Sequence, residues 1–271
     1  MKAIVNAPIC PLMSRPRPDC EKADEALYGM VVEVLEETTP DFWKVRTHYR
    51  YEGYAPVKNL LTDPARVRAW EGLAPCHTPW SKNFIDVMAE PKYRSWPLIT
   101  LPRGALISCG GHEDGWTTVT LADGRTGYTR SSWVAVEEFT SGLTEDERRQ
   151  RLCDTAKLYA GTHYRWGGKS PAGIDCSGLV SMSYLLNGII IYRDAKIMEG
   201  FPIREIPREQ MKPADLLLFP GHVALYLGKG MYIHSTGKAG ADGVTLNSLD
   251  PTHPDYREDL AQKLTAVGTY F

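Results

Sequence analysis

One cysteine and two histidines in the C-terminal half have the types and placement that nucleophilic catalysis requires. Cys176 stands in the run Asp-Cys-Ser-Gly-Leu-Val, at the predicted start of a helix. His222, in Gly-His-Val-Ala-Leu-Tyr, and His234, in Ile-His-Ser, fall on predicted strands. A thiol attacks as its thiolate, and a neighbouring imidazole can take its proton. We therefore predict that Cys176 is the nucleophile, His222 the general base and His234 the group that orients the base.

The elements around these residues support the same chemistry. A helix N-terminus favours negative charge, which would lower the pKa of Cys176. The turn Gly228–Gly230 joins the two predicted strands, and antiparallel neighbours bring such side chains within reach. Acyl transfer also needs donors for the developing oxyanion. We expect these to be the backbone N–H of Cys176 and the phenol of Tyr164, in Tyr-Arg-Trp-Gly-Gly.

Polar residues flank the cysteine on both sides. The carboxylate of Asp175 would oppose thiolate formation if it pointed at the sulfur, so we expect it to face a substrate cation. Helix capping is a rival role for Asp175 that can coexist with the first. Ser177 is expected to donate a hydrogen bond to a substrate carboxylate.

Two alternatives to catalysis were weighed for the cysteine and the histidines. A buried cysteine with two core histidines is the structural alternative. A zinc site made of Cys176, His222 and His234 would have three ligands and none of the short paired spacings of zinc motifs. The combined pattern favours catalysis, and it implies no metal and no cofactor.

Composition limits the class of protein. The chain has 271 residues, of which 43% are hydrophobic and 24% charged, as in a globular protein. Its 31 basic and 33 acidic residues give a net charge of -2, which suggests no nucleic-acid partner. Nothing approaches the ~20 apolar residues of a membrane span. The first residues lack the apolar stretch of about 7–15 residues in a signal peptide, so a cytoplasmic location is expected, or secretion with the signal already removed. The oligomeric state stays open.

Cysteine usage points to reduced thiols. No Cys-x-x-Cys occurs, and a chain of this length needs no disulfide staples. Only Cys10 and Cys20 are close enough in sequence to be considered as a disulfide. The six cysteines lie at positions 10, 20, 76, 109, 153 and 176.

The N-terminal half shows β patterns that occur twice. The spacing of Trp43, Gly53 and Tyr54 is similar to that of Trp116, Gly127 and Tyr128, which indicates an internal repeat. A helix over 64–72, starting after Asp63 with proline at its first position, reads as a connector. These segments resemble two bacterial SH3-like barrels, at residues 1–63 and 86–139, with a connector at 64–85. Strands are predicted over 31–35, 43–47, 51–55, 105–109, 116–121, 126–128 and 133–136.

The character changes from residue 140 to residue 271. Thr144 with Glu147 three positions later predicts a capped helix start, and a second helix is predicted from Cys176 to Leu186. Helices followed by an antiparallel sheet indicate an α+β domain. The fold class is therefore two tandem small all-β SH3-like barrels followed by an α+β papain-like cysteine peptidase domain. The predicted strands of its sheet are 215–219, 223–227 and 231–234.

Five sequence runs in this last domain resemble the NlpC-type cell-wall cysteine peptidases. The resemblance implies cleavage of the bond between γ-D-glutamate and a diamino acid in murein stem peptides. Cys176, His222 and His234 match the nucleophile, base and orienting residue of that family. The runs are Tyr164 to Gly168, Asp175 to Val180, Ala214 to Phe219, Gly221 to Tyr226 and Ile233 to Ser235.

Two barrels ahead of such a domain look like the YkfC-type branch of the family. That branch acts on murein peptides that are already cut and have a free N-terminal L-alanine. In it the first barrel supplies an acidic residue and a tyrosine beside the aspartate that precedes the nucleophile. The resemblance assigns Asp175 to this role, with Glu21 and Tyr51 as the expected barrel partners. Glu25 and Tyr54 are the alternatives.

The segment after the nucleophile helix also resembles the branch. Arg193 and Asp194 match residues of its substrate cleft. Ala195 departs from the pattern, because serine is common there and would hydrogen-bond the D-glutamate carboxylate.

The expected function is a cysteine endopeptidase that releases L-Ala-D-Glu from L-Ala-γ-D-Glu-diamino acid peptides during murein peptide recycling. The alternatives are a secreted hydrolase of intact cell wall and a catalytically inert peptide-binding module. The sequence leaves diaminopimelate and lysine both open at the third position of the substrate.

Overall fold

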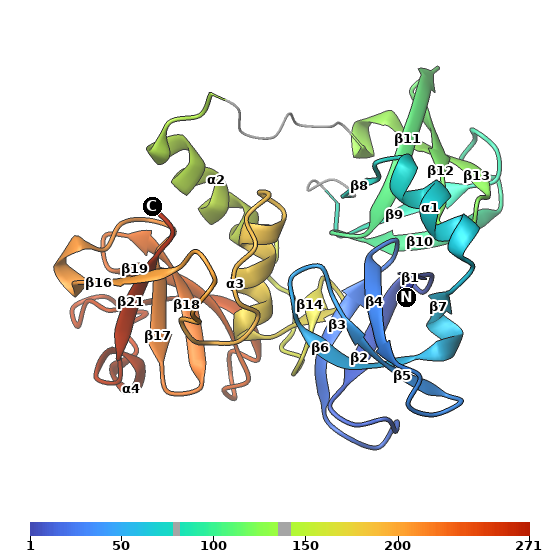
Figure 1. Ribbon diagram of the computed structural model, residues 1–271. Coiled ribbons are helices and arrows are strands. Elements are labelled where there is room, and N and C mark those ends of the chain that lie inside the picture. Colours follow the sequence, from blue (N-terminus) through green and yellow to red (C-terminus); the bar gives the residue numbers. More distant parts are fainter. Residues whose placement is uncertain (78–81, 135–141) are drawn as a thin grey trace. The chain divides into compact units, whose positions relative to one another are not determined.

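The computed structural model describes residues 1–77, 82–134 and 142–271 (Figure 1). The chain divides into two compact units, Met1–Glu137 and Glu138–Phe271, and each is described by itself. The domain boundary predicted at 139/140 lies outside the described residues. In the part of the chain that is described, every helix is too short or too polar to cross a bilayer.

The N-terminal unit begins with an antiparallel sheet of seven strands. Their order across the sheet is β3-β2-β6-β5-β4-β1-β7. A 3-10 turn, η1 (Val57–Asn59), follows β6. The strands are β1 (Lys2–Val5), β2 (Ile9–Met13), β3 (Lys22–Leu27), β4 (Val31–Glu36), β5 (Phe42–Arg46), β6 (Glu52–Pro56) and β7 (Leu60–Leu61).

The second sheet of this unit repeats the strand order of the first. Its order across the sheet is β10-β9-β13-β12-β11-β8. If the strands of each sheet are numbered from one, both sheets have the order 3-2-6-5-4-1, and the first sheet has β7 as an additional edge strand. The repeat in the sequence therefore corresponds to a repeat in topology. The strands are β8 (Cys76–His77), β9 (Phe84–Met88), β10 (Pro97–Pro102), β11 (Leu106–Glu113), β12 (Trp116–Thr120) and β13 (Thr126–Arg130).

The repeated tryptophans and glycines lie on equivalent hairpins. Trp43 and Gly53 are on β5 and β6, where Gly53 faces Val45. Trp116 and Gly127 are on β12 and β13, in the hairpin of the second sheet that corresponds to the first. The description of each sheet as an SH3-like barrel stays a prediction.

Helix α1 (Pro64–Gly72) links the two sheets through a shared core. Asp63 caps it by accepting a hydrogen bond from the backbone N–H of Ala65, as the sequence predicted. Trp70 is buried and its indole N–H donates to the carbonyl of Gly29 at 2.7 Å. The hydroxyl of Tyr28, from the first sheet, accepts from the backbone N–H of Ala122 in the second. One buried cluster therefore contains side chains from both sheets and from α1.

Two expectations in this unit are corrected or resolved. The strand predicted over 133–136 is wrong at Trp133, which belongs to the 3-10 turn η2 (Ser131–Trp133), and residues 135–136 lie outside the described part. The apolar pattern there reflects the burial of Val134 in the core. Cys10 and Cys20 are both free thiols, which excludes the disulfide considered between them.

The C-terminal unit places its long helices before its sheet. The six-stranded antiparallel sheet has the order β16-β21-β17-β18-β19-β20, and a small ladder pairs β14 with β15. The elements are α2 (Glu145–Lys157), β14 (Lys169–Ser170), β15 (Gly173–Ile174), α3 (Cys176–Leu185), β16 (Arg204–Ile206), η3 (Arg208–Gln210), β17 (Leu216–Phe219), β18 (His222–Gly228), β19 (Met231–Thr236), β20 (Gly243–Ser248), α4 (Glu258–Ala261) and β21 (Ala266–Thr269).

Helices α2 and α3 pack together and against the sheet, with α3 contacting β18 and β19 (Figure 1). The predicted capping box is present at the start of α2, between Thr144 and Glu147. Arg149 of α2 forms a buried ion pair of 2.8 Å with Asp215, which precedes β17. The phenol of Tyr184, on α3, donates to the carbonyl of Ala214 at 2.6 Å. These contacts attach α2 and the C-terminal end of α3 to the segment that leads into β17.

Candidate active site

Cys176 is the first residue of α3, and its side chain is buried. Burial raises the pKa of the Cys176 thiol, and the charge of Asp175 adds to the rise. Hydrogen bonds from the backbone of Val223 and Ser177 to the sulfur act in the opposite direction. Because Val223 directly follows His222, the sulfur lies next to the residue that the sequence predicted as its base.

Two glycines allow the nucleophile helix to approach the preceding loop. A Cβ atom on Gly178 would clash with the carbonyl oxygen of Gly168. A Cβ atom on Gly168 would in turn clash with the carbonyl oxygen of Gly173. The glycines of the Gly-Gly and Cys-Ser-Gly runs are therefore required by close packing of backbone against backbone.

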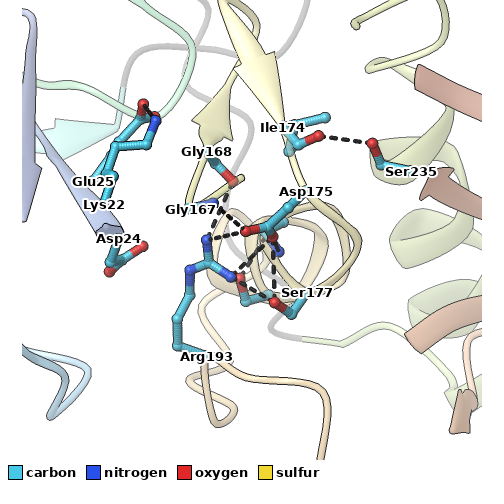
Figure 2. A network of polar contacts seen from close by, with 12 residues as sticks. Lys22, Asp24, Glu25, Gly167, Gly168, Ile174, Asp175, Ser177, Arg193 and Ser235 are labelled. Carbon is cyan, nitrogen blue, oxygen red and sulfur yellow. Dashed lines mark hydrogen bonds and ion pairs between the residues drawn. The ribbon is translucent and has the colours of Figure 1, made fainter. Parts of the chain in front are cut away.

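Asp175 is the N-cap of α3 and the centre of a buried polar network (Figure 2). Its carboxylate accepts from the backbone N–H groups of Gly178 at 2.6 Å and Gly167 at 2.8 Å. Both of its oxygens also accept from the guanidinium of Arg193 at 3.1 Å. The capping role is thus present. Arg193 supplies the charged partner that a buried carboxylate needs, and the expected contact of Asp175 with a substrate cation stays a prediction.

Ser177 and Arg193 belong to the same network. The Ser177 hydroxyl donates to Asp175 at 3.2 Å and accepts from Arg193 at 2.7 Å, and its expected hydrogen bond to a substrate carboxylate stays a prediction. Arg193 is 2% exposed and also donates to the carbonyl of Gly168 at 3.2 Å. Asp194 follows in the loop and raises the pKa of the Tyr192 phenol by its charge, second to burial. Arg193 therefore holds the start of α3, and its predicted contact with substrate stays a prediction.

A further hydrogen bond connects the nucleophile loop to the histidine strands. The hydroxyl of Ser235 on β19 donates to the carbonyl of Ile174 at 2.7 Å (Figure 2). Ser235 follows His234, and Ile174 precedes the cap of α3. The bond thereby sets the distance between the strand that holds the second histidine and the helix that holds the thiol.

The two predicted histidines contact each other directly. His222 is the first residue of β18, and His234 lies in the middle of β19. His222 Nε2 and His234 Nδ1 are 2.7 Å apart. His234 is fully buried, whereas His222 is half-buried. The arrangement leaves Nδ1 of His222 as the ring nitrogen for the thiol.

Burial keeps the histidine pair neutral. It lowers the pKa of His222 to about 3, with the neighbouring His234 and Arg257 adding to the effect. It lowers the pKa of His234 to about 4, although the hydrogen bond that His234 donates to Asn247 opposes this. Together with the raised pKa of Cys176, this gives a neutral thiol and a neutral imidazole at pH 7. The helix N-terminus was predicted to lower the thiol pKa, and burial outweighs that effect here.

Asn247 is a site residue that the sequence analysis missed. It lies on β20, and its Oδ1 is 2.9 Å from Nε2 of His234. Its Nδ2 donates to the backbone carbonyl of Asp255 at 3.0 Å. In the sequence, Asn247 could have been noticed as a polar amide in the strand pattern Val-Thr-Leu-Asn. Only the pairing of β20 with β19 shows that this amide contacts His234.

Tyr164 is half-buried and electrostatically coupled to the nucleophile. Burial raises the pKa of Tyr164 to about 12, and the charges of Cys176 and Asp175 add to the rise. The phenol therefore keeps its proton at neutral pH and can donate it to an oxyanion. Its ring packs against Gly237, where a Cβ atom would come within 3.3 Å of it. The oxyanion role of Tyr164 stays a prediction, and the protonated phenol is consistent with it.

The predicted barrel residues belong to the N-terminal unit. Glu21 is exposed and precedes β3, while Tyr51 is half-buried and precedes β6. Of the alternatives, Glu25 is buried on β3 and pairs with Lys22 at 2.6 Å, and Tyr54 is half-buried on β6. Their predicted role at the amino end of the substrate stays a prediction.

Another acidic residue of the N-terminal unit does meet a tyrosine. The phenol of Tyr49 donates to the buried carboxylate of Asp24 at 2.6 Å and to the carbonyl of Glu25 at 3.2 Å. Figure 2 includes Asp24 and Glu25 among its labelled residues.

Among the described residues, no group of three or more His, Cys, Asp or Glu side chains is arranged to hold a metal ion.

Comparisons with known proteins show which family the chain is similar to. A model of the NlpC/P60 family matches residues 161–259. The chain is 46% identical over 275 residues, covering all of both sequences, to Dipeptidyl-peptidase 6 of Lysinibacillus sphaericus. It is 34% identical over 141 residues, or 47% of this chain and 44% of the relative, to Gamma-D-glutamyl-L-lysine dipeptidyl-peptidase of Bacillus subtilis (strain 168).

A solved structure has the same overall fold. It is the crystal structure of an NlpC/P60 family protein from Bacillus cereus ATCC 10987, with a TM-score of 0.79. The match covers 100% of this chain and 99% of that chain at 20% identity. At that identity the similarity concerns the fold alone.

Proposed function

The chain belongs to the NlpC/P60 family and is a cysteine peptidase, and from this premise we propose that it hydrolyses the γ-D-glutamyl–diamino acid bond of murein stem peptides that have a free N-terminal L-Ala. The products would be L-Ala-D-Glu and a peptide that starts with the diamino acid. The observation that carries the proposal is the site itself: the buried thiol of Cys176 is hydrogen-bonded by the backbone of Val223, which directly follows His222 of the hydrogen-bonded histidine pair. The full-length similarity to a dipeptidyl-peptidase supports release of a dipeptide.

We propose the following first half of the reaction. As the Cys176 sulfur attacks the carbonyl carbon of the γ-D-glutamyl amide, Nδ1 of His222 accepts the thiol proton. Proton transfer accompanies the attack because both groups are neutral beforehand. The phenol of Tyr164 and the backbone N–H of Cys176 donate to the oxyanion. The C–N bond then breaks, and the protonated His222 gives its proton to the amine of the departing diamino acid.

The second half releases the dipeptide. A water molecule gives a proton to His222 and attacks the thioester carbonyl. The C–S bond breaks, the sulfur takes the proton back from His222, and the γ-carboxylate of D-glutamate is formed. Throughout, His234 accepts a hydrogen bond from His222 and stabilises its charged form.

Selection of a free amino end is the finer part of the proposal. An alanine still linked to the glycan has no ammonium charge, so an acidic side chain discriminates between cut and uncut peptides. In our proposal Asp175, which also pairs with Arg193, binds this ammonium together with Glu21 and Tyr51. Substrates of this kind arise from murein that has been cut, so we assign the enzyme to cytoplasmic recycling of murein peptides.

The test is mass spectrometry of the protein incubated with L-Ala-γ-D-Glu-meso-diaminopimelate, the lysine analogue and their N-acetyl forms. Release of Ala-Glu from the unblocked peptides alone is expected. Cys176→Ala should abolish it, whereas Cys153→Ala, the same change at another buried thiol of this unit, should not.

Each other outcome removes a defined part of the proposal. Equal cleavage of blocked and unblocked peptides would refute the selection by Glu21 and Tyr51 and the recycling role. Unchanged activity of Cys176→Ala would refute the mechanism. Cleavage of intact sacculi would move the enzyme to the cell wall, and inactivity toward every murein substrate would support a binding module.

A further inference from the structure

Three polar side chains form a row across three adjacent strands of the C-terminal sheet. His222 is on β18, His234 on β19 and Asn247 on β20. Tyr232 lies opposite Asn247 and His234 opposite Thr245, so Asn247 is diagonal to His234 on the same face of the sheet. The contacts along the row measure 2.7 Å and 2.9 Å.

The far end of the row is anchored to a group that can only accept. Asn247 Nδ2 is 3.0 Å from the backbone carbonyl oxygen of Asp255. Because that oxygen has no proton, the amide must turn its NH₂ group toward Asp255 and its carbonyl oxygen toward His234. The amide oxygen, in turn, only accepts, so the proton on His234 must sit on Nε2.

The same logic continues to the catalytic base. With its proton on Nε2, neutral His234 has a lone pair on Nδ1, which accepts from Nε2–H of His222. His222 then has its own lone pair on Nδ1, the nitrogen that the thiol requires. We propose that Asn247 is a positioning residue that sets the tautomers of both histidines and so keeps the base nitrogen of His222 unprotonated.

This role goes beyond the orienting function of His234 and rests on the proposed roles of Cys176 and His222. Without an acceptor at Nε2, His234 could place its proton on Nδ1 instead. His222 would then have to accept from it through Nε2, and its Nδ1 would hold the proton. In that state the base nitrogen could not take the thiol proton, so loss of the Asn247 amide would lower kcat with little effect on KM.

Other charged groups around the row affect its titration. Arg257 lowers the pKa of both histidines by its charge, and Asp259 raises that of His234. These two residues form an ion pair of 2.6 Å with each other. Tyr232 and Asp255 are also titratable residues at the row: the Tyr232 ring lies 5.2 Å from that of His234, and the backbone carbonyl of Asp255 accepts from Asn247. A charge introduced at Asn247 therefore adds to the opposing effects of Arg257 and Asp259 on the pKa values of the histidines.

The direct test reads the tautomers without using activity. Long-range ¹H–¹⁵N NMR spectra of the full chain, labelled at histidine, identify which ring nitrogen is protonated. We expect Nε2–H forms for both His222 and His234 in the unchanged protein, and Nδ1–H forms to appear in Asn247→Leu. An Nδ1–H form of either histidine in the unchanged protein would overturn the proposal, as would unchanged tautomers in Asn247→Leu.

A second test uses the pH dependence of kcat/KM. In Asn247→Leu we expect kcat to fall by about 10-fold or more, as for other residues that orient an imidazole through its second nitrogen. In Asn247→Asp the carboxylate still accepts from Nε2–H of His234, and its negative charge favours the imidazolium. The acidic limb of kcat/KM should therefore move to higher pH.

Leu246→Asp is the matched control, because it adds the same charge to the same strand on the opposite face of the sheet, at a side chain that is 46% exposed. Its acidic limb should stay in place. A purely structural role would lower the unfolding temperature of both Asn247 variants and leave the limb unmoved, and that result would refute the proposal. Activity in Cys176→Ala would refute the proposed function alone, since the NMR test does not depend on it.

Discussion

At the residue scale, burial determines the protonation states of Cys176 and His222 more than local charge does. The thiol of Cys176 has a raised pKa and the imidazole of His222 a lowered one, and desolvation is the largest cause in both cases. A neutral pair therefore exists before substrate binds, in place of the thiolate–imidazolium pair that a helix N-terminus favours. In the proposed mechanism His222 must accept the thiol proton during the attack. The reaction therefore depends on which ring nitrogen of His222 is unprotonated.

Tyr164 supplies a residue-scale prediction. Tyr164→Phe removes the phenol proton that is expected to stabilise the oxyanion, so kcat should fall about 100-fold with little change in KM. Steady-state kinetics on the unblocked tripeptide measure this. Tyr270→Phe, the same change at an aromatic residue that packs on Tyr184, serves as the control and should keep full activity. Equal activity of the two variants would exclude Tyr164 from the oxyanion site.

At the element scale, the site is the meeting of one helix end and three strand positions. Helix α3 presents the thiol, and β18, β19 and β20 align the two histidines and Asn247 in a row. The backbone of α3 can come this close because Gly178 lies against Gly168. Asp175 and Arg193 then fix the helix start by a buried, bidentate ion pair.

A single methyl group tests this close approach. Gly178→Ala would push α3 away from Gly168, and a shift of the sulfur of about 1 Å can lower kcat by about 100-fold. We also expect a destabilisation of about 1–3 kcal/mol from overpacking. Gly72→Ala is the matched control, since its Cβ atom would meet nothing within 4 Å. Kinetics and thermal unfolding of both variants decide whether the contact matters, and equal values would contradict it.

At the scale of the whole molecule, the N-terminal unit is a repeat whose halves share a core. The two sheets have the same strand order, and the buried side chains between them include Tyr28, Trp70 and Val119. A shared core makes the folding of one half depend on the other. The unit should therefore unfold as one cooperative body.

Trp70 tests this cooperativity. Trp70→Ala removes a fully buried side chain and its hydrogen bond to Gly29, so it should cost about 3–5 kcal/mol and loosen both sheets together. Hydrogen exchange on each sheet, combined with urea unfolding, measures the effect. Trp96→Ala, at a side chain that is 77% exposed, should change stability by less than about 0.5 kcal/mol. Loss of protection in only one sheet would show that the two halves fold separately.

The buried histidines predict how stability depends on pH. The folded pKa values of His222 and His234, about 3 and about 4, lie below the usual 6.5, so the unfolded chain binds more protons between these values. Stability is therefore complete above about pH 6.5 and is lost as the pH falls toward 4, by on the order of 2–3 kcal/mol for each histidine. Urea unfolding at pH 7 and pH 4.5 measures this loss. It should shrink in His234→Asn and persist in His253→Asn, and an equal loss in both would contradict the assignment.

The sequence by itself determined the helix start at Cys176 and the family, and the comparisons confirm the family. It also predicted the catalytic trio of Cys176, His222 and His234. These features depend on short stretches of sequence, in which a helix cap, a glycine or a strand pattern can be recognised without knowledge of the tertiary structure. Tertiary structure alone decided that Asp175 pairs with Arg193 and that Asn247 meets His234. Such pairings depend on strand register and on which groups are taken out of water together. The neutral state of the thiol and the imidazoles has the same origin, because desolvation exists only once the core has closed around them.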